Sequence, residues 1–265
     1  MKYGMNLLLW TGNDSAEYFP LLAKLKATGF DGVEIPVFGG EPADYKPVRA
    51  ERDKNGLKCT TVTILTAETN AVSPDAAVRK NAVEWLKKVV EINHVLGSET
   101  VCGPYHSAIG VFSGSGPTAD EKKRSADVLR QAAEFARQAN LMMAIEYLNR
   151  FECYVLNTAV GAVELVGMVN HPNFRTMFDT FHAHIEEKSQ AAAIRTVKPV
   201  RESTSWPVKA QIPVDGVFDM SRYSYGELQI WTGSPSQVAW RNPARVPGAN
   251  PHSLSSTARW PPSQR

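Results

Sequence analysis

The feature that most constrains the fold is a regular alternation of short apolar runs with longer amphipathic segments. The short runs predict buried β-strands, and the longer segments, whose apolar residues recur every three or four positions, predict helices. This alternation is typical of a parallel sheet covered by helices. The expected strands are 3–9, 31–37, 58–65, 99–102, 141–147 and 174–178, and the expected helices are 15–28, 43–56, 75–96, 118–139 and 156–169.

Several helix ends carry local signals. Gly29, Gly56 and Gly97 each come just after an expected helix, where a left-handed C-cap favours glycine. Thr118 is followed three residues later by Glu121, which predicts a capping box at the start of the fourth helix.

The number of strand–helix units favours a closed barrel. Five or six units fit into about 195 residues, and a single (β/α)₈ barrel takes about 250 residues of a chain that has 265. No GxGxxG motif follows any expected strand, which argues against a dinucleotide-binding sheet. We therefore expect an α/β protein with the (β/α)₈ TIM-barrel fold.

The bulk composition gives no indication of a nucleic-acid or membrane partner. The chain has 29 Lys and Arg against 27 Asp and Glu, a net charge of +2, and no clustered basic segment. The apolar run at residues 1–10 is too short to span a bilayer. Three widely spaced cysteines, Cys59, Cys102 and Cys153, form neither a disulfide framework nor a zinc motif. A cytoplasmic location with reduced thiols is the expectation.

The C-terminal part differs in character from the rest. Residues 206–265 contain eight Pro, eight Ser and four of the six Trp, but only three acidic residues. No helical or strand periodicity is evident from Gly233 onward. We therefore expect a regular barrel portion over residues 1–198 and a divergent segment over 199–265 that completes the barrel poorly, with strands seven and eight degraded or irregular.

Functional residues of such barrels gather where strands end, at the carboxyl-terminal face. Glu146 ends the apolar run 141–145, where a carboxylate would be desolvated unless a metal or another cation faces it. A salt bridge to Arg150 or to a neighbouring lysine is the alternative. Asp179 follows the sixth expected strand, and it either binds a cation or caps the next helix.

Four further residues belong to the same face. His182 follows Asp179 by three residues, and its imidazole could hydrogen-bond a substrate hydroxyl. Glu152, His106 and Glu34 come after or at the ends of expected strands and are candidate substrate contacts, each with an ordinary loop or strand position as its alternative. His184 alternates with His182, and we expect it to face away.

Two long motifs resemble those of a known family. EYLNRFE at 146–152 and FDTFHAHIEE at 178–187 are similar to the paired motifs of the ketose 3-epimerases, the D-tagatose and D-psicose 3-epimerase group of the xylose-isomerase-like sugar isomerase/epimerase barrels. MNLLLWTG from Met5, GFDGVEIP from Gly29 and CGPYHSAIGVFSGSGPT from Cys102 also resemble this group. The similarity is nearly continuous from residue 1 to about 198.

The resemblance implies a divalent metal, Mn²⁺ in the first place and otherwise Mg²⁺ or Co²⁺. Glu146 and Asp179 match two of the family's four metal ligands, and Glu146 also matches a catalytic acid/base. Glu152 and His182 match substrate contacts. The implied reaction is inversion at C3 of a ketose through a cis-enediolate, with one glutamate acting on each face of the sugar. The family also implies homo-oligomers.

The sequence departs from the family at the other half of this site. The family has a metal-binding histidine on strand seven, but no histidine occurs here between His184 and His252. The match returns in QIPVDGVF at 211–218 and then fails in GELQIWTG at 226–233, where Trp231 stands in place of the family's second glutamate. Glu227 lies at the start of that expected strand, the wrong end for the barrel mouth.

Three hypotheses therefore remain beside an impaired ketose epimerase. A hydroxypyruvate- or inosose-type isomerase of the same barrel group would act on another small carbonyl compound. A non-catalytic barrel would bind a sugar without converting it. A reading-frame disturbance in the coding sequence would explain a match that stops, returns and stops again. No basic cluster suitable for a phosphate is evident, which favours a free sugar.

Overall fold

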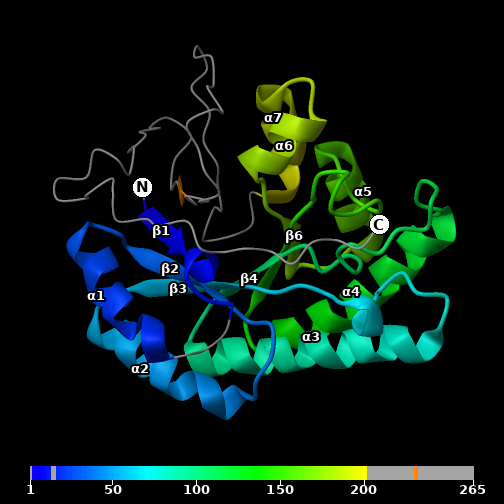
Figure 1. Cartoon of the computed structure of the whole chain (residues 1–265). Helices are drawn as coiled ribbons and strands as arrows, with labels where there is room; N and C mark the ends of the chain where they lie inside the picture. Colours follow the sequence, from blue (N-terminus) through cyan, green and yellow to red (C-terminus); the bar gives the residue numbers. More distant parts are fainter. Residues whose placement is uncertain (1, 13–15, 202–229, 232–265) are drawn as a thin grey trace, which may run out of the picture.

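The centre of the molecule is a sheet of six parallel strands in the computed structural model, which describes residues 2–12, 16–201 and 230–231 (Figure 1). Each of these strands pairs with the strand that follows it in the chain. This order confirms the predicted α/β class, because parallel neighbours must be joined by crossover connections. The strands are β1 (Lys2–Asn6), β2 (Gly32–Pro36), β3 (Lys58–Val62), β4 (Thr100–Gly103), β5 (Met142–Ile145) and β6 (Phe174–Thr176).

Helices connect the strands, and each packs against at least one other helix. In Figure 1, α1 to α4 lie below the sheet, while α5, α6 and α7 gather beside β6. The α-helices are α1 (Phe19–Ala27), α2 (Lys46–Lys54), α3 (Ala76–Leu96), α4 (Ala119–Gln138), α5 (Ala159–Val169), α6 (Thr180–Glu186) and α7 (Gln190–Arg201). Short 3₁₀ turns occur at η1 (Leu7–Leu9), η2 (Ala16–Tyr18), η3 (Pro42–Tyr45) and η4 (Ala67–Thr69).

The two faces of the strands have different surroundings. Val33 and Ile35 of β2 belong to the large apolar core, which also contains buried leucines of α1, α3, α4 and α5. Glu34, between them, accepts hydrogen bonds from Asn6 of β1 and Thr60 of β3. Because successive side chains of a strand point to opposite faces, the helix-facing core and a polar inner layer come from the same strands.

The helix ends follow the local signals in the sequence. Helix α3 begins at Asp75, whose carboxylate accepts from the backbone N–H of Ala77 at 2.8 Å, and ends at Gly97 with φ of +66°. Helix α4 begins with the predicted capping box, in which Thr118 and Glu121 each accept a backbone N–H of the other. These ends confirm the predicted starts of both helices and the C-cap at Gly97.

A short strand, β7 (Ile230–Trp231), pairs with the free edge of β1 in the antiparallel sense. Its Trp231 lies opposite Lys2, and Ile230 lies opposite Tyr3. The family resemblance implies an eighth strand over 226–233 that starts near Glu227 and has Trp231 at the position of the family's glutamate. The pairing places Trp231 at the amino end of β1 instead, so the carboxyl end of β7 faces away from the mouth.

Helix α7 continues to Arg201 and includes the run Val197–Val200. The predicted boundary at residue 198 therefore falls inside a helix. Residues 202–229 and 232–265 lie outside the described residues, as do Glu227 and most of the segment expected to be irregular. The prediction of a separate C-terminal portion from residue 199 stays a prediction.

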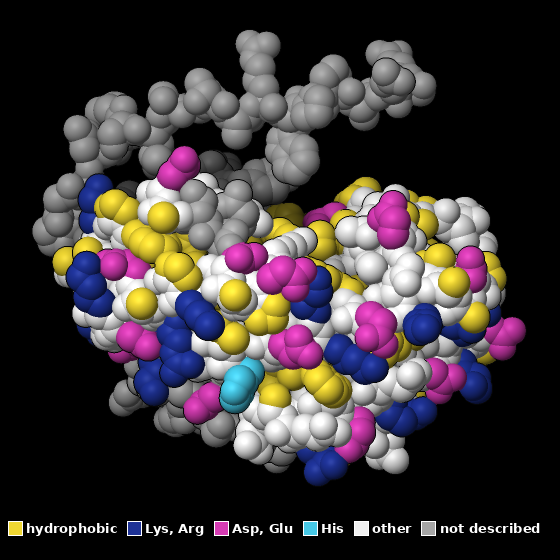
Figure 2. Space-filling view, turned by 90° about the horizontal axis from the view of Figure 1, so that it is seen from below, with side chains coloured by type: hydrophobic (Ala, Val, Ile, Leu, Met, Phe, Trp, Pro, Cys, Tyr) yellow, Lys and Arg dark blue, Asp and Glu magenta, His cyan; other side chains and the backbone are white. Residues whose placement is uncertain are grey.

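Charges of both signs are interspersed on the face of the molecule that Figure 2 shows, where Lys and Arg alternate with Asp and Glu. This mixture matches the balanced composition of the chain. Among the described helices, none is both long and apolar enough to cross a bilayer.

Candidate functional site

Glu146 directly follows β5 and lies at the carboxyl-terminal edge of the sheet, as predicted. Its backbone N–H donates to the carbonyl of Gly103 at the end of β4, at 3.0 Å, and the residue is 8% exposed. Gly103 has φ of +123°, and a β-carbon there would collide with the carbonyl of Thr63. Glycine at this position therefore lets β3 and β4 approach closely beside the Glu146 backbone.

Asp179 follows β6 and is the N-cap of α6. Its Oδ1 accepts from the backbone N–H of Phe181 at 2.6 Å, and the residue is 9% exposed. Asp179 therefore caps the helix, which is one of the two roles predicted for it from the sequence. Capping does not exclude cation binding, because Oδ1 makes the cap and Oδ2 is a second acceptor on the same carboxylate.

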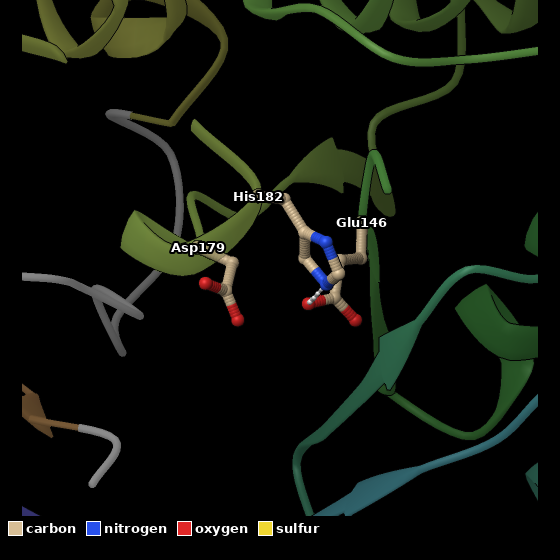
Figure 3. A group of neighbouring side chains, drawn as sticks. All are labelled: Glu146, Asp179 and His182. Carbon is tan, nitrogen blue, oxygen red and sulfur yellow. Dashed lines mark ion pairs between the residues drawn. The ribbon is translucent and has the colours of Figure 1, made fainter. Parts of the chain in front are cut away.

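His182 lies one turn into α6 and brings its ring beside Glu146 (Figure 3). The distance from His182 Nε2 to Glu146 Oε1 is 3.8 Å, and His182 is 4% exposed. In Figure 3 the carboxylates of Glu146 and Asp179 approach from two different elements, with the imidazole next to Glu146. Residues from β5 and α6 therefore converge at one point of the mouth.

Glu146, Asp179 and His182 lie close enough together to be candidates for binding one divalent cation. One potential ligand atom from each of Glu146, Asp179 and His182 lies within 4.8 Å of the other two. Atoms that bind one ion lie no farther apart than about 5 Å, twice a bond of up to about 2.6 Å. The carboxylate oxygens of Glu146 and Asp179 are the kind of ligand that Mn²⁺ and Mg²⁺ prefer. The structure thus provides a candidate metal site.

Hydrogen bonding distinguishes the role of His182 from that of the two carboxylates. The backbone N–H of Asn149 donates to His182 Nδ1 at 3.1 Å. A ring nitrogen that accepts a hydrogen bond carries no proton, so neutral His182 carries its proton on Nε2. An Nε2–H group is a donor and not a ligand. This arrangement favours the predicted contact with substrate.

Asn149 organises the loop between Glu146 and Glu152. Its Oδ1 accepts from the backbone N–H of Phe151 at 3.0 Å, which directs Nδ2 towards Glu152 and His182. The Glu152 carboxylate lies 4.0 Å from His182 Nδ1 and has a side chain 43% exposed. The structure therefore brings Glu152 to the same site as His182, through a buried asparagine that the sequence had not singled out.

Arg150 does not pair with Glu146, the alternative considered for that carboxylate. Its guanidinium instead forms a salt bridge with Glu186 at the end of α6, at 2.7 Å. Glu186 was also not singled out from the sequence. Its spacing of four residues from His182, which places both on one helix face, is the signal that could have identified it.

Glu34 and His106 are held by other neighbours. Glu34 is 1% exposed and accepts from Asn6 at 3.0 Å and Thr60 at 3.2 Å within the sheet. His106 is completely buried, with Nδ1 at 2.9 Å from Ser107 Oγ and Nε2 at 3.9 Å from Cys153 Sγ. Neither belongs to the group of potential metal ligands. Their predicted contact with substrate stays a prediction. His184 is exposed, as expected.

A separate cavity of about 300 Å³ lies at the opposite end of the strands. Arg52, Lys58, Cys59 and Glu99 line it, at and before the amino ends of β3 and β4. Because barrel sites form at the carboxyl ends of strands, and because the three converging side chains are there, we assign the chemistry to the mouth and not to this cavity.

Comparison with known proteins places the chain among sugar-converting barrels. A family model described as the xylose isomerase-like TIM barrel matches residues 22–202. D-psicose 3-epimerase of Ruminiclostridium cellulolyticum is 33% identical over 74% of this chain and 68% of its own length. D-psicose 3-epimerase of Agrobacterium fabrum is 32% identical over 76% of this chain and 71% of its own length.

Solved structures agree with these relatives. The crystal structure of D-psicose 3-epimerase from Clostridium cellulolyticum H10 with D-tagatose superposes with a TM-score of 0.69 at 30% identity, covering 76% of this chain and 71% of that one. The motif resemblance, the parallel sheet and the relatives thus lead to one assignment. The chain belongs to the xylose isomerase-like TIM barrel family and, within it, to the ketose 3-epimerase group of sugar isomerases and epimerases.

Proposed function

We propose that this chain is a divalent-metal-dependent ketose 3-epimerase that acts on a free ketose through a cis-enediolate, with a site reduced to about half of the family's set. The observation that carries the proposal is the convergence of Glu146, Asp179 and His182 within 4.8 Å at the barrel mouth. Glu146 and Asp179 would hold the cation. Mn²⁺ is the metal that the family favours.

Each residue has a part that follows from its position. A bound divalent cation supplies Lewis-acid polarisation of the ketose carbonyl. The Glu146 carboxylate accepts the proton from C3, which leaves the sugar as its cis-enediolate. His182 donates from Nε2 to the sugar oxygen on which negative charge develops, and Glu152, beside it, accepts from a sugar hydroxyl. Return of the proton to C3 from Glu146 regenerates the starting configuration.

Inversion at C3 requires a second proton donor on the opposite face of the sugar. In the family this donor is a glutamate, and the matching residue here is Trp231. We therefore expect C3 hydrogen exchange with retention to exceed epimerisation. Loss of one general acid/base lowers a rate by about 10²–10⁴-fold. Epimerisation should fall short of a complete relative by this amount.

Metal binding is tested first, by titration of the purified chain with Mn²⁺ followed by electron paramagnetic resonance of the free ion. We expect weak binding that Glu146→Gln and Asp179→Asn both abolish. Asn caps helices as well as Asp does, so Asp179→Asn removes a charged ligand while preserving the N-cap of α6. Unchanged Mn²⁺ binding in both variants would place the metal elsewhere, and no binding by the parent protein would contradict the proposed metal site.

Catalysis is tested by incubating D-fructose, D-tagatose and D-ribulose with Mn²⁺-loaded protein in D₂O. We expect deuterium to enter C3 faster than the C3 epimer accumulates, and Glu146→Gln to abolish both. Sugar binding without deuterium incorporation would identify a non-catalytic sugar-binding barrel. Epimerisation at the rate of a complete relative would contradict the proposed loss of the second acid/base. The metal identity, homo-oligomerisation and cytoplasmic location stay predictions.

A further inference from the structure

Helix α6 holds the loop after β5 at two neighbouring points. The backbone N–H groups of Asn149 and Arg150 are consecutive, and each donates to a side chain of α6. The acceptors are His182 Nδ1, at 3.1 Å, and Glu186 Oε1, at 2.7 Å. His182 and Glu186 are four residues apart and therefore lie on one face of the helix.

Glu186 accepts the backbone N–H of Arg150 and also forms a bidentate ion pair with the guanidinium of the same residue. Arg150 Nε donates to Oε1 at 3.0 Å and to Oε2 at 3.1 Å, and its terminal nitrogen donates to Oε2 at 2.7 Å. The side chain of Glu186 is 4% exposed, whereas that of Arg150 is 62% exposed. Burial alone would raise the pKa of Glu186, but the bonds from Arg150 outweigh burial and lower it. Glu186 is thus held as a buried carboxylate.

The contact of Asn149 with His182 and the contact of Arg150 with Glu186 depend on one another, because the two donors are adjacent residues of the loop. Arg150 directly follows Asn149, so a loop that leaves Glu186 also carries the Asn149 N–H away from His182. When the Asn149 N–H no longer donates to Nδ1, this hydrogen bond no longer favours the Nε2–H tautomer of His182 over the Nδ1–H tautomer. The side-chain amide of Asn149, at 3.0 Å from Nδ1, belongs to the same loop.

We propose that Arg150 and Glu186 are a positioning pair that fixes the ring orientation and tautomer of His182. Within the described residues, the pair forms hydrogen bonds within itself and not with Glu146 or Asp179. It acts through the loop, which presents the Asn149 N–H to Nδ1 and leaves Nε2–H directed at Glu146. His182 is thereby a fixed donor and is kept from becoming a third metal ligand.

The tautomer is tested by ¹⁵N NMR of histidine side chains in the metal-free full chain, with His182 assigned through His182→Asn. Protonated and unprotonated ring nitrogens have well-separated shifts. We expect one tautomer, with the proton on Nε2, in the parent protein. Glu186→Met should give a mixture of both tautomers. Glu186→Gln keeps a carbonyl acceptor for the Arg150 N–H and should restore the Nε2–H form in part.

The matched control is Glu134→Gln, which removes the same kind of Arg–Glu contact elsewhere. Glu134 and Arg137 form an exposed pair near the end of α4, at 2.6 Å, and Glu134 also contacts His171 Nε2 at 3.1 Å, so the variant is expected to affect the His171 signals only. This control should leave the His182 signals unchanged. A single Nε2–H tautomer in folded Glu186→Met would overturn the proposal. Should Glu186→Met fail to fold, a folded Glu186→Ala variant with unaltered His182 signals would overturn it equally.

A second measurement concerns the sugar and rests on the proposed function. In the deuterium-exchange reaction, Glu186→Met should lower the maximal rate by about tenfold, as loss of a supporting hydrogen bond does around catalytic ligands, with the KM nearly unchanged. Glu186→Gln should recover part of the rate, and Glu134→Gln should match the parent. A parent without exchange would contradict the proposed function alone, because the NMR measurement decides on the positioning pair independently.

Discussion

Tyr147 directly follows Glu146 and belongs to the large apolar core. Its ring contacts Phe178 edge-on, with centroids 6.0 Å apart, and the residue is 1% exposed. Within the described residues its phenol oxygen has no hydrogen-bond partner. Burial raises the pKa of Tyr147, and the nearby carboxylates of Glu187 and Asp179 raise it further. The hydroxyl is therefore buried without the compensation that such groups usually have.

We expect Tyr147→Phe to raise the free energy of unfolding by about 1 kcal/mol, because an unsatisfied buried hydroxyl costs about 1–3 kcal/mol. Urea unfolding followed by circular dichroism measures this. Tyr105→Phe is the matched control: Tyr105 is also fully buried, but its hydroxyl donates to the carbonyl of Val101 at 3.2 Å. The free energy of unfolding of Tyr105→Phe should fall by about 1 kcal/mol, because the substitution removes this hydrogen bond. A loss of similar size in Tyr147→Phe would mean that its hydroxyl has a partner.

Helix α4 illustrates how much of an element is determined locally. The capping box at Thr118 and Glu121 satisfies backbone N–H groups that the first turn leaves open. Glu121 also accepts from the hydroxyl of Tyr154, at 2.6 Å, and so connects the start of α4 to the loop that follows the site. The N-terminus of α4 is therefore joined to the barrel mouth.

Thr118→Ala should lower the free energy of unfolding by about 1 kcal/mol through loss of the cap. Thr118→Ser keeps a hydroxyl acceptor and should stay close to the parent. Thermal and urea unfolding of the three proteins provide the comparison. Equal losses in the Ala and Ser variants would show that the methyl group, and not the cap, stabilises this helix end.

Elements with local signals were predicted closely. Helix α3 was expected over 75–96 and is Ala76–Leu96, because periodicity and end caps depend only on neighbouring residues. The direction of β7 was not predictable in this way, since strand pairing depends on residues more than 200 positions away. The strand-end rule also placed Glu146 and Asp179 correctly at the sheet edge. The bond from Asn149 to His182, which spans 33 positions, emerged only from the fold.

The buried His106 makes the free energy of unfolding of the chain depend on pH. Burial lowers the pKa of His106 from 6.5 to about 3. Between these two values the unfolded chain binds a proton that the folded chain does not. The stability that His106 contributes is therefore present above about pH 6.5 and is lost as the pH falls towards 3, by about 1.4 kcal/mol per unit.

His106→Gln should remove this part of the pH dependence. Between pH 6.5 and pH 5, we expect the free energy of unfolding of the parent to fall by about 2 kcal/mol more than that of the variant. Urea unfolding at a series of pH values gives the slope of the free energy of unfolding against pH for both proteins. A loss of stability in the variant that is the same at every pH does not change its slope. His94→Gln, at an exposed position, controls for removal of a histidine. Parallel slopes for the parent and His106→Gln would contradict the assignment.

The antiparallel pairing of β7 limits how the second acid/base that the proposed function lacks could be supplied. Alignment with the family suggests Trp231→Glu as the obvious repair. Trp231, however, lies opposite Lys2, whereas the mouth end of β1 is at Asn6. Four residues of strand separate these positions, or about 13 Å. A carboxylate introduced at residue 231 would thus be too distant to face Glu146 across a sugar. Under the proposed function, supplying the second acid/base therefore requires replacing a length of backbone, not one side chain.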